Sequence, residues 1–529
     1  MSIDTPEKAP RPGDTPYRLA GWEYVVLAGL VALQCVLGFR QLSLPSLWHD
    51  ELVHVFVARE IAASGKSLLP SGIFYPSSLF YNYLLGATVK LFGDDATVVR
   101  GLTVVTSLGL LVVTHLLLRQ LMGRAASLVA VALLVLSPWH LAWTRQSRMY
   151  ELQALLYMAY LACLWRFWGT QAPRNRLTWG TGAVALYFAS VFTSFHSILF
   201  LGTAGAFATV MQIVERAPLR SRWTLTLAGC TIAGLLTLGG LWINPNSADQ
   251  SAVFETGLGG TLPDPQRMDR YLYFRFLLTN HSLGYGLLAT AGTALLLWHK
   301  KRSGLYLALS FWVPVLVLTL LIGYRRDRFM YFAFPFYIAL ASYGLVWAGI
   351  AVSRLHQSLG RAAIGLLCGM FLIRFAFSQV QLVQDTFHTS RGASITLATR
   401  MPEWKLPCAY VKAHEAGHAI LTTTCLPVMN YAGRADNWFP NRYHAWEMQE
   451  SGLVGLDSLE ALQSFVKAHP RGFYLSERSR FEMWVNHRDL NPLLGPEYAW
   501  IQANMERIDA ACSSDVTVYR WGPDTVNTP

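Results

Sequence analysis

Two adjacent carboxylates, Asp50 and Glu51, follow the first long apolar run of the chain in the stretch SLWHDELVHVFVARE. A positioned carboxylate can take a proton from a hydroxyl group during a transfer reaction. Asp50 has the place of a first-turn residue, where free backbone N–H groups keep a carboxylate ionised. We therefore expect an amphipathic helix that begins here and lies at the membrane surface. The alternative is that the acidic pair only caps this helix.

Arginines recur in two other short stretches, WTRQSRMYE and GYRRDRFMYF. A guanidinium group matches the oxygens of a phosphate with two parallel hydrogen bonds, so an anionic ligand would explain them. The alternative is salt bridges to Asp327 and Glu151, or arginines that reach out to lipid headgroups. The candidates for phosphate binding are Arg145, Arg148, Arg325, Arg326 and Arg328.

Histidines and aromatic residues accompany these charges. Aromatic rings can stack on sugar faces and are typical of the membrane interface. A hydrogen-bonded structural role is an equal alternative for a loop histidine such as His196. The candidates for substrate contacts are His49, His54, Tyr75, Tyr150, His196 and Tyr331.

The elements that must position these residues are membrane helices. The chain has 529 residues, of which 53% are hydrophobic and 14% charged, too few charges to cover a soluble protein of this size. Apolar segments long enough to span recur about eleven times. A shorter apolar segment at 77–92 is expected to lie at the interface or to re-enter the membrane. The predicted spans are 22–39, 97–118, 125–143, 150–168, 178–194, 197–214, 223–243, 283–299, 304–323, 329–351 and 362–379.

Basic residues concentrate in alternate short loops, which predicts a cytoplasmic N-terminus. Asp50 and Glu51, which follow the first span, then lie outside. An odd number of spans places the C-terminal region outside as well. The net charge of +11 indicates anchoring at the membrane surface and not nucleic-acid binding. The predicted divisions are a cytoplasmic tail (1–20), a transmembrane domain (21–380) and an outer domain (381–529).

The composition changes after the last span, where helical patterns alternate with short strand-like runs at 418–424, 472–477 and 515–521. This alternation predicts a small α/β domain with a largely parallel sheet. The fold class is therefore mostly α, a polytopic helical bundle with a C-terminal α/β domain. Three cysteines of this region, Cys408, Cys425 and Cys512, could form one disulfide, but their number does not name the pair.

Four stretches resemble the GT-C class of membrane glycosyltransferases, in the branch of protein O-mannosyltransferases and lipid A aminoarabinose transferases. They are LWHDELVHVFVARE, YPSSLFYNYLLGATVKLFGDDATVVRGLTVV, LVLSPWHLAWTRQSRMYELQALL and RDRFMYFAFPFYIALASYGL. The resemblance as a whole extends over most of 20–378. One departure is Ile73-Phe74-Tyr75, which stands where aminoarabinose transferases have a lysine.

The resemblance implies an inverting transfer of a monosaccharide from a polyprenyl-phosphate donor, such as an undecaprenyl- or decaprenyl-linked sugar. The acceptor would be a glycan, glycolipid or protein outside a bacterial inner membrane. Asp50 matches the catalytic base, Glu51 the acid that helps place the acceptor, and Glu151 the acidic position of the second outer loop. The branch generally needs no cofactor, although Asp50 and Glu151 could hold a divalent metal ion if they converge.

Two other functions compete with glycosyl transfer. The sequence His414-Glu415-Ala416-Gly417-His418 matches the zinc-protease pattern H-E-x-x-H, which needs both histidines on one face of a continuous helix. Gly417 and the β-branched residues that follow predict instead that the helix ends inside the motif. A transporter or flippase of a lipid-linked sugar is the second alternative. Inverted repeats and charges that line a path at the membrane midplane would support a transporter, and the sequence shows neither.

Overall fold

The computed structural model describes residues 20–243, 271–277, 283–322, 327–355, 402–439, 450–477 and 494–522. The candidate residues Arg325 and Arg326 lie outside these ranges, as do the predicted tail up to residue 19 and the predicted last span, 362–379.

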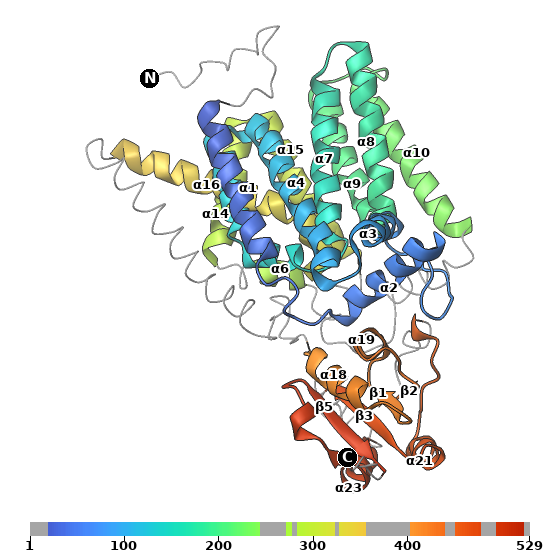
Figure 1. Cartoon of the computed structure of the whole chain (residues 1–529). Helices are drawn as coiled ribbons and strands as arrows, with labels where there is room; N and C mark the ends of the chain where they lie inside the picture. Colours follow the sequence, from blue (N-terminus) through green and yellow to red (C-terminus); the bar gives the residue numbers. More distant parts are fainter. Residues whose placement is uncertain are drawn as a thin grey trace.

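Long helices form the N-terminal two thirds of the molecule (Figure 1). They follow the predicted apolar segments up to 329–351, and the segment 125–143 divides into α5 and α6, which are bent by 64°. The helices are α1 (Gly21–Phe39), α2 (His49–Ser64), α3 (Leu79–Phe92), α4 (Ala96–Met122), α5 (Arg124–Val135), α6 (Pro138–Thr144), α7 (Tyr150–Gly169), α8 (Pro173–Thr193), η1 (Phe195–Ile198), α9 (Leu199–Val214), α10 (Arg222–Ile243), α13 (Leu272–Arg275), α14 (Leu283–His299), α15 (Lys301–Leu320), η3 (Asp327–Ala333) and α16 (Phe334–Leu355).

Five of the described helices are long and apolar enough to cross a membrane, or six if α5 and α6 together make one span. The predicted count of eleven is therefore not confirmed. Several remaining helices carry polar residues that their neighbours bury. Glu151 and Gln153 on α7, for example, are almost fully enclosed. Such residues lower the mean hydropathy of a helix without exposing polar groups to lipid.

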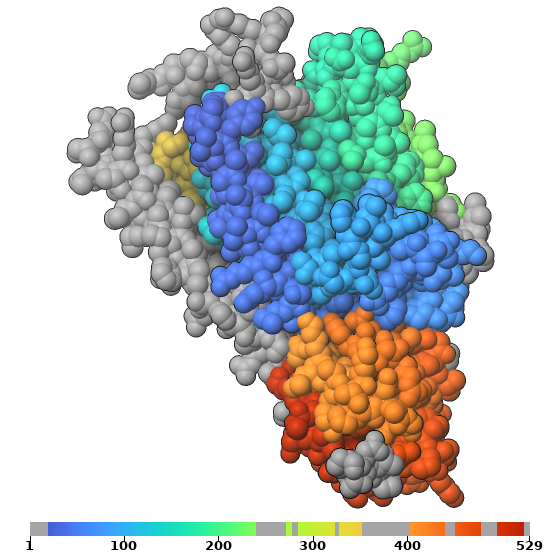
Figure 2. Space-filling view, in the orientation of Figure 1, coloured from blue at the N-terminus to red at the C-terminus, as the bar shows by residue number. Residues whose placement is uncertain are grey.

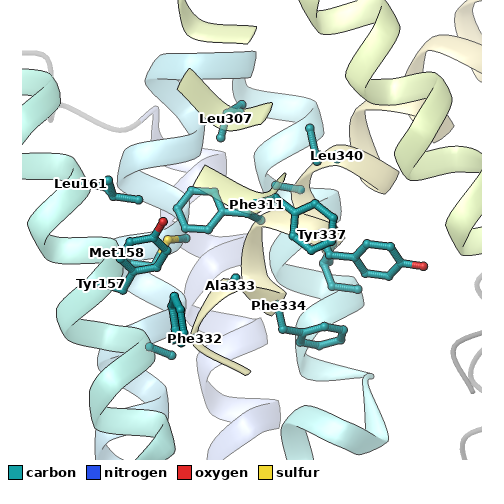
Figure 3. Packing of buried hydrophobic residues seen from close by; sticks show 14 of the residues in the cluster. Tyr157, Met158, Leu161, Leu307, Phe311, Phe332, Ala333, Phe334, Tyr337 and Leu340 are labelled. Atoms are coloured by element: carbon teal, nitrogen blue, oxygen red, sulfur yellow. The ribbon is translucent and has the colours of Figure 1, made fainter. Parts of the chain in front are cut away.

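The centre of the bundle is a closely packed cluster rich in aromatic residues (Figure 3). The Tyr157 ring meets Phe332 edge-on at 5.1 Å and Phe200 at 4.3 Å, so α7, η3 and α9 share one cluster. Helices α14 and α16 approach closely through glycines. A Cβ atom added to Gly292 would lie 1.9 Å from the Leu340 carbonyl oxygen, so this contact needs a residue without a side chain.

Helices α2 and α3 lie at one end of the bundle, opposite the end at which α1 begins (Figure 1). Both are shorter than a membrane span, and α3 confirms the helix expected over 77–92. Helix α2 begins at His49, as the sequence predicts, and ends at Gly65 in the left-handed conformation (φ 78°). The acidic pair therefore sits on the first turn of a helix at the bundle end.

The C-terminal part is a five-stranded sheet with helices, in the strand order β2-β1-β3-β5-β4. The strands that pair around β1 are parallel, whereas β5 pairs with β3 and β4 in antiparallel fashion. The predicted largely parallel sheet is thus wrong, and the sheet is mixed. Its elements are α18 (Lys405–His414), β1 (Ala419–Thr422), α19 (Cys425–Tyr431), β2 (Asn437–Trp438), α21 (Leu459–Ala468), β3 (Gly472–Glu477), α23 (Leu494–Asn504), β4 (Glu506–Arg507), η4 (Asp509–Ala511) and β5 (Val516–Trp521).

This sheet part packs directly against the bundle end that carries α2 (Figure 2). Leu426 of α19 is buried in the same apolar cluster as Leu52 and Val53 of α2. The Leu47 backbone N–H donates to the Tyr431 hydroxyl at 2.6 Å, and the Trp404 N–H donates to Ser46 Oγ at 3.0 Å. The loop that leads into the acidic pair is therefore held between the two parts of the molecule.

The three cysteines of the sheet part, Cys408, Cys425 and Cys512, form no disulfide in the structure. The disulfide that the sequence left open is therefore absent from the described residues, which include Cys408, Cys425 and Cys512.

Candidate active site

Asp50 lies on the first turn of α2 and its side chain is 26% exposed. Its Oδ2 atom accepts from Arg328 Nη1 at 3.0 Å and lies 3.1 Å from Arg148 Nη1. The two arginines come from segments far apart in the chain, the loop before α7 and the start of η3. The fold therefore brings together one carboxylate and two of the predicted phosphate-binding arginines.

The arginines also control the charge of this carboxylate. Burial by itself would raise the pKa of Asp50, but the nearby guanidinium groups of Arg148 and Arg328 outweigh it. The pKa of Asp50 is therefore held well below its ordinary value, and the carboxylate is ionised at neutral pH.

Arg148 is fixed from several sides. Its Nη1 donates to the Asp50 backbone carbonyl at 2.8 Å, and its guanidinium lies over the Tyr150 ring (5.4 Å) and the Trp48 ring (5.8 Å). Its Nη2 also donates to the Tyr150 hydroxyl at 3.3 Å. Stacking on aromatic faces orients an arginine in a way that a lysine could not reproduce. Tyr150 therefore acts on the site through Arg148.

Glu51 is held inside the protein by several hydrogen bonds. It is fully buried, with Oε2 accepting from the Trp48 N–H (2.9 Å) and Oε1 from the Ser147 N–H (2.7 Å). Both oxygens also accept from Arg100, at 2.9 and 2.8 Å. The role of Glu51 in placing the acceptor stays a prediction. In the structure Glu51 caps the start of α2 through the Trp48 N–H, and Asp50 is the partly exposed acid of the pair.

Arg100 is a residue that sequence reasoning missed. Its five N–H donors all have partners, two on Glu51 and three on backbone carbonyls of residues 42, 45 and 46. It is 2% exposed at the start of α4. An arginine inside an apolar span was the available signal, because a charge there needs a buried partner.

Arg145 likewise bonds to backbone carbonyl groups. Its Nη1 donates to the carbonyls of Leu37 (3.0 Å), Gly38 (3.0 Å) and Arg40 (2.6 Å) at the end of α1. The last carbonyls of a helix have no partners within the helix and attract a cation. Arg145 therefore binds the end of α1 in the structure, and its role in phosphate binding stays a prediction.

Glu151 and Tyr331 are fully buried and hydrogen-bonded to each other. The Tyr331 hydroxyl donates to Glu151 Oε1, which also accepts from Thr144 Oγ1 at 3.0 Å. His140 Nδ1 lies 3.2 Å from the same oxygen. The substrate contact of Tyr331 and a metal position between Asp50 and Glu151 stay predictions.

The remaining candidates surround the site. Burial, aided by the charge of Arg148, lowers the pKa of His54 to about 3, so this side chain is neutral, and its Nδ1 lies 2.7 Å from Asn82 Oδ1. Burial raises the pKa of Tyr75 to about 12, so its phenol is neutral. His196 stacks on Phe329 at 4.2 Å, next to Arg328.

His49, at the start of α2, contacts the sheet part. Its Nε2 lies 2.9 Å from Glu450 Oε2. This contact is a second link between the start of α2 and the C-terminal part of the chain.

No protein-family model and no curated protein sequence matches this chain. Solved structures do. ArnT from Cupriavidus metallidurans bound to undecaprenyl phosphate superposes with a TM-score of 0.61 at 14% identity, over 96% of this chain and 100% of that one. The archaeal oligosaccharyltransferase AglB from Archaeoglobus fulgidus, in complex with an inhibitory peptide and a dolichol-phosphate, gives 0.59 at 11% identity over 88% and 70%.

Both proteins are GT-C glycosyltransferases. The chain has the GT-C fold. Its candidate membrane helices and these neighbours make it an integral membrane protein. An AglB structure from the same archaeon, in complex with zinc and sulfate, gives a TM-score of 0.54 at 12% identity over 86% of this chain and 68% of that one.

The zinc-protease motif has the wrong geometry in this structure. His414 is the last residue of α18, Gly417 is left-handed (φ 72°), and His418 precedes β1. The two histidines therefore lie on a helix end and a strand start, as the sequence predicts. No cluster of three or more histidine, cysteine, aspartate or glutamate side chains that could hold a metal occurs in the described parts of the chain.

We expect purified full-length protein to contain far less than one zinc ion per chain, and His414→Ala to leave both the zinc content and transfer activity unchanged. Elemental analysis by mass spectrometry checks this, with His418→Ala as the matched variant. One zinc per chain that disappears in both variants would restore the metal site.

Proposed function

We propose that this GT-C protein is an inverting glycosyltransferase that moves a monosaccharide from a polyprenyl-phosphate donor to an acceptor outside the membrane. The observation that carries the proposal is the meeting of Asp50 with Arg148 and Arg328 on the bundle end covered by the sheet part. A base and two phosphate-binding cations are the groups that this reaction requires.

In the reaction, Asp50 accepts the proton of the acceptor hydroxyl as that oxygen bonds to the anomeric carbon of the sugar. The bond between that carbon and the phosphate oxygen breaks, and its electron pair leaves with the phosphate. Attack from the face opposite the phosphate inverts the anomeric centre. Arg148 and Arg328 stabilise the negative charge that grows on the departing phosphate.

The ion pairs of Asp50 suggest how donor binding prepares the base. A donor phosphate that takes up the two arginines would leave Asp50 without its closest positive partners. The pKa of the carboxyl would then rise toward its ordinary value, and a more basic carboxylate accepts a proton more readily. Donor binding would thereby activate Asp50.

If the donor phosphate takes the two arginines from Asp50, kcat and kcat/KM should depend differently on pH. A carboxyl with a depressed pKa stays ionised to low pH, so Asp50 should not limit kcat/KM for the donor in mildly acidic solution. In the donor complex its pKa is higher, so kcat should fall on acidification at a higher pH than kcat/KM does. Initial rates measured from about pH 4, close to the ordinary pKa of an aspartate, up to about pH 8 check this. If kcat and kcat/KM fall at the same acidic pH, the donor phosphate does not take the arginines from Asp50.

The proposed setting is a bacterial inner membrane with the N-terminus in the cytoplasm and the sheet part outside. Undecaprenyl- or decaprenyl-phosphate would carry a hexose or a pentose, and the acceptor would be a glycan, a glycolipid or a protein. The sheet part packs beside α2, so it is well placed to shape the acceptor site.

The experiment that tests the function is sugar transfer in membranes from a panel of radiolabelled polyprenyl-phosphate sugars. We expect one donor to release free polyprenyl phosphate and to label an outer acceptor with inverted anomeric configuration. Movement of a lipid-linked sugar across the membrane without release of polyprenyl phosphate would indicate a flippase. Retention of configuration would contradict a single displacement with Asp50 as the base.

A further inference from the structure

A buried hydrogen bond joins the two segments that carry the site arginines. Glu151 lies three residues after Arg148 at the start of α7, and Tyr331 lies three residues after Arg328 in η3. The Tyr331 hydroxyl donates to Glu151 Oε1, and both side chains have no exposed surface. The bond therefore links the two arginine-bearing segments, and each of its partners lies three residues after the arginine of its segment.

Other polar side chains complete this contact from further elements. His140 Nδ1 on α6 lies 2.7 Å from the Tyr331 hydroxyl and 3.2 Å from Glu151 Oε1. Thr144 Oγ1 donates to the same oxygen at 3.0 Å and accepts from Gln34 Nε2 of α1 at 3.2 Å. The cluster thus fixes α1, α6, α7 and η3 relative to one another.

Aromatic contacts connect this polar cluster to Arg148. Trp143 lies against Tyr331 (6.1 Å between ring centroids) and against Tyr150 (4.7 Å). Tyr150 in turn stacks on Arg148 at 5.4 Å. In η3, Phe332 follows Tyr331 and is anchored in the aromatic core beside Tyr157 (Figure 3).

Stability alone is a poor reason for such a cluster. Buried carboxylates are costly to desolvate, and a buried polar group can often be replaced by packed apolar residues without loss. Directional hydrogen bonds do something that apolar packing does less well, which is to fix one relative position of two segments. A misplacement of about 1 Å in a reacting group can cost about a hundredfold in rate.

We propose that the Glu151–Tyr331 hydrogen bond, supported by His140, sets the spacing of Arg148 and Arg328 so that both reach one ligand. In the absence of donor this ligand is the Asp50 carboxylate, and in the proposed function it is the donor phosphate. Glu151, Tyr331 and His140 are positioning residues, because their burial keeps them from touching substrate. The inference rests on the proposed function for its second ligand only.

The test uses Tyr331→Phe in full-length protein in lipid nanodiscs, with undecaprenyl phosphate as the probe. The change removes one hydroxyl and keeps the ring. We expect the affinity for undecaprenyl phosphate to fall about tenfold. Tyr187→Phe is the matched control, since this buried hydroxyl of α8 bonds to Thr237 Oγ1 at 2.8 Å and lies outside both arginine-bearing segments. Its affinity should stay at the wild-type value.

A second readout does not depend on the donor. Electron cryo-microscopy of ligand-free Tyr331→Phe should show that one of the two arginines has left Asp50, while Tyr187→Phe keeps both pairs. Both pairs intact and wild-type affinity in Tyr331→Phe would overturn the inference, because the hydroxyl would then be merely structural. If one pair is lost but the wild-type protein binds no undecaprenyl phosphate, the positioning role stands and the proposed function fails.

Discussion

Replacing Asp50 by asparagine should abolish sugar transfer while the protein still binds undecaprenyl phosphate. The amide has the shape of the carboxyl group but cannot accept the hydroxyl proton. General bases contribute about 10²- to 10⁴-fold to a rate, so we expect transfer to fall by about that factor. Single-turnover transfer in membranes, at saturating donor, measures the chemical step apart from binding.

The same variant should bind the phosphate more tightly. In the wild-type protein the donor phosphate must compete with the Asp50 carboxylate for Arg148 and Arg328. An amide is a much weaker competitor for guanidinium groups than a carboxylate. We expect the dissociation constant of undecaprenyl phosphate to fall about tenfold, the effect of removing one moderately strong charge-assisted contact.

Asp94→Asn is the matched control for this charge change. Asp94 forms an exposed ion pair with Arg59 of α2 (2.7 Å) at the same end of the bundle, and such pairs contribute little. Its transfer rate and affinity should equal those of the wild-type protein. If Asp50→Asn transfers sugar at the wild-type rate, Asp50 is not the base, and the base must lie outside Glu51 and Glu151, which are buried.

Replacing Glu51 by glutamine should have the largest effect on stability. Glu51 and Arg100 form a buried bidentate pair, and the loss of one partner leaves the other charge buried without compensation. Breaking such a pair costs about 3–5 kcal/mol. We expect a large fall in the thermal unfolding temperature of the purified protein, together with loss of the ordered loop before α2.

Thermal unfolding in detergent checks this, again beside Asp94→Asn, whose cost should be about 0–1 kcal/mol. The result also separates two roles of Glu51. A glutamine variant with wild-type stability and no transfer would return Glu51 to the acceptor site. A destabilised variant that still binds undecaprenyl phosphate at low temperature would agree with the cap and loop role.

Much of the architecture could be predicted because it follows from local patterns. The strand-like runs at 472–477 and 515–521 appear as β3 and β5, and α2 begins at the acidic pair. The direction of β5 could not be predicted, since strand pairing depends on contacts between distant residues. The same non-local dependence hides which α-helices bury their polar residues against neighbours and which face lipid.

For the site, the sequence could predict which residues gather on one side but not which partners they choose. Asp50, Arg148 and Arg328 meet as expected. Glu51, one residue further along the helix, is turned inward to Arg100, because successive helical positions point about 100° apart. Arg145 meets the end of α1, a contact between segments more than a hundred residues apart that no local spacing reveals.

The measurement that tests the proposed site most directly is a structure of the full-length protein with undecaprenyl phosphate, by electron cryo-microscopy in nanodiscs. We predict that the phosphate lies within hydrogen-bond distance of Arg148 and Arg328, and that Asp50 has lost both ion pairs and faces the position of the sugar. A phosphate bound elsewhere, with both arginines still on Asp50, would contradict the account.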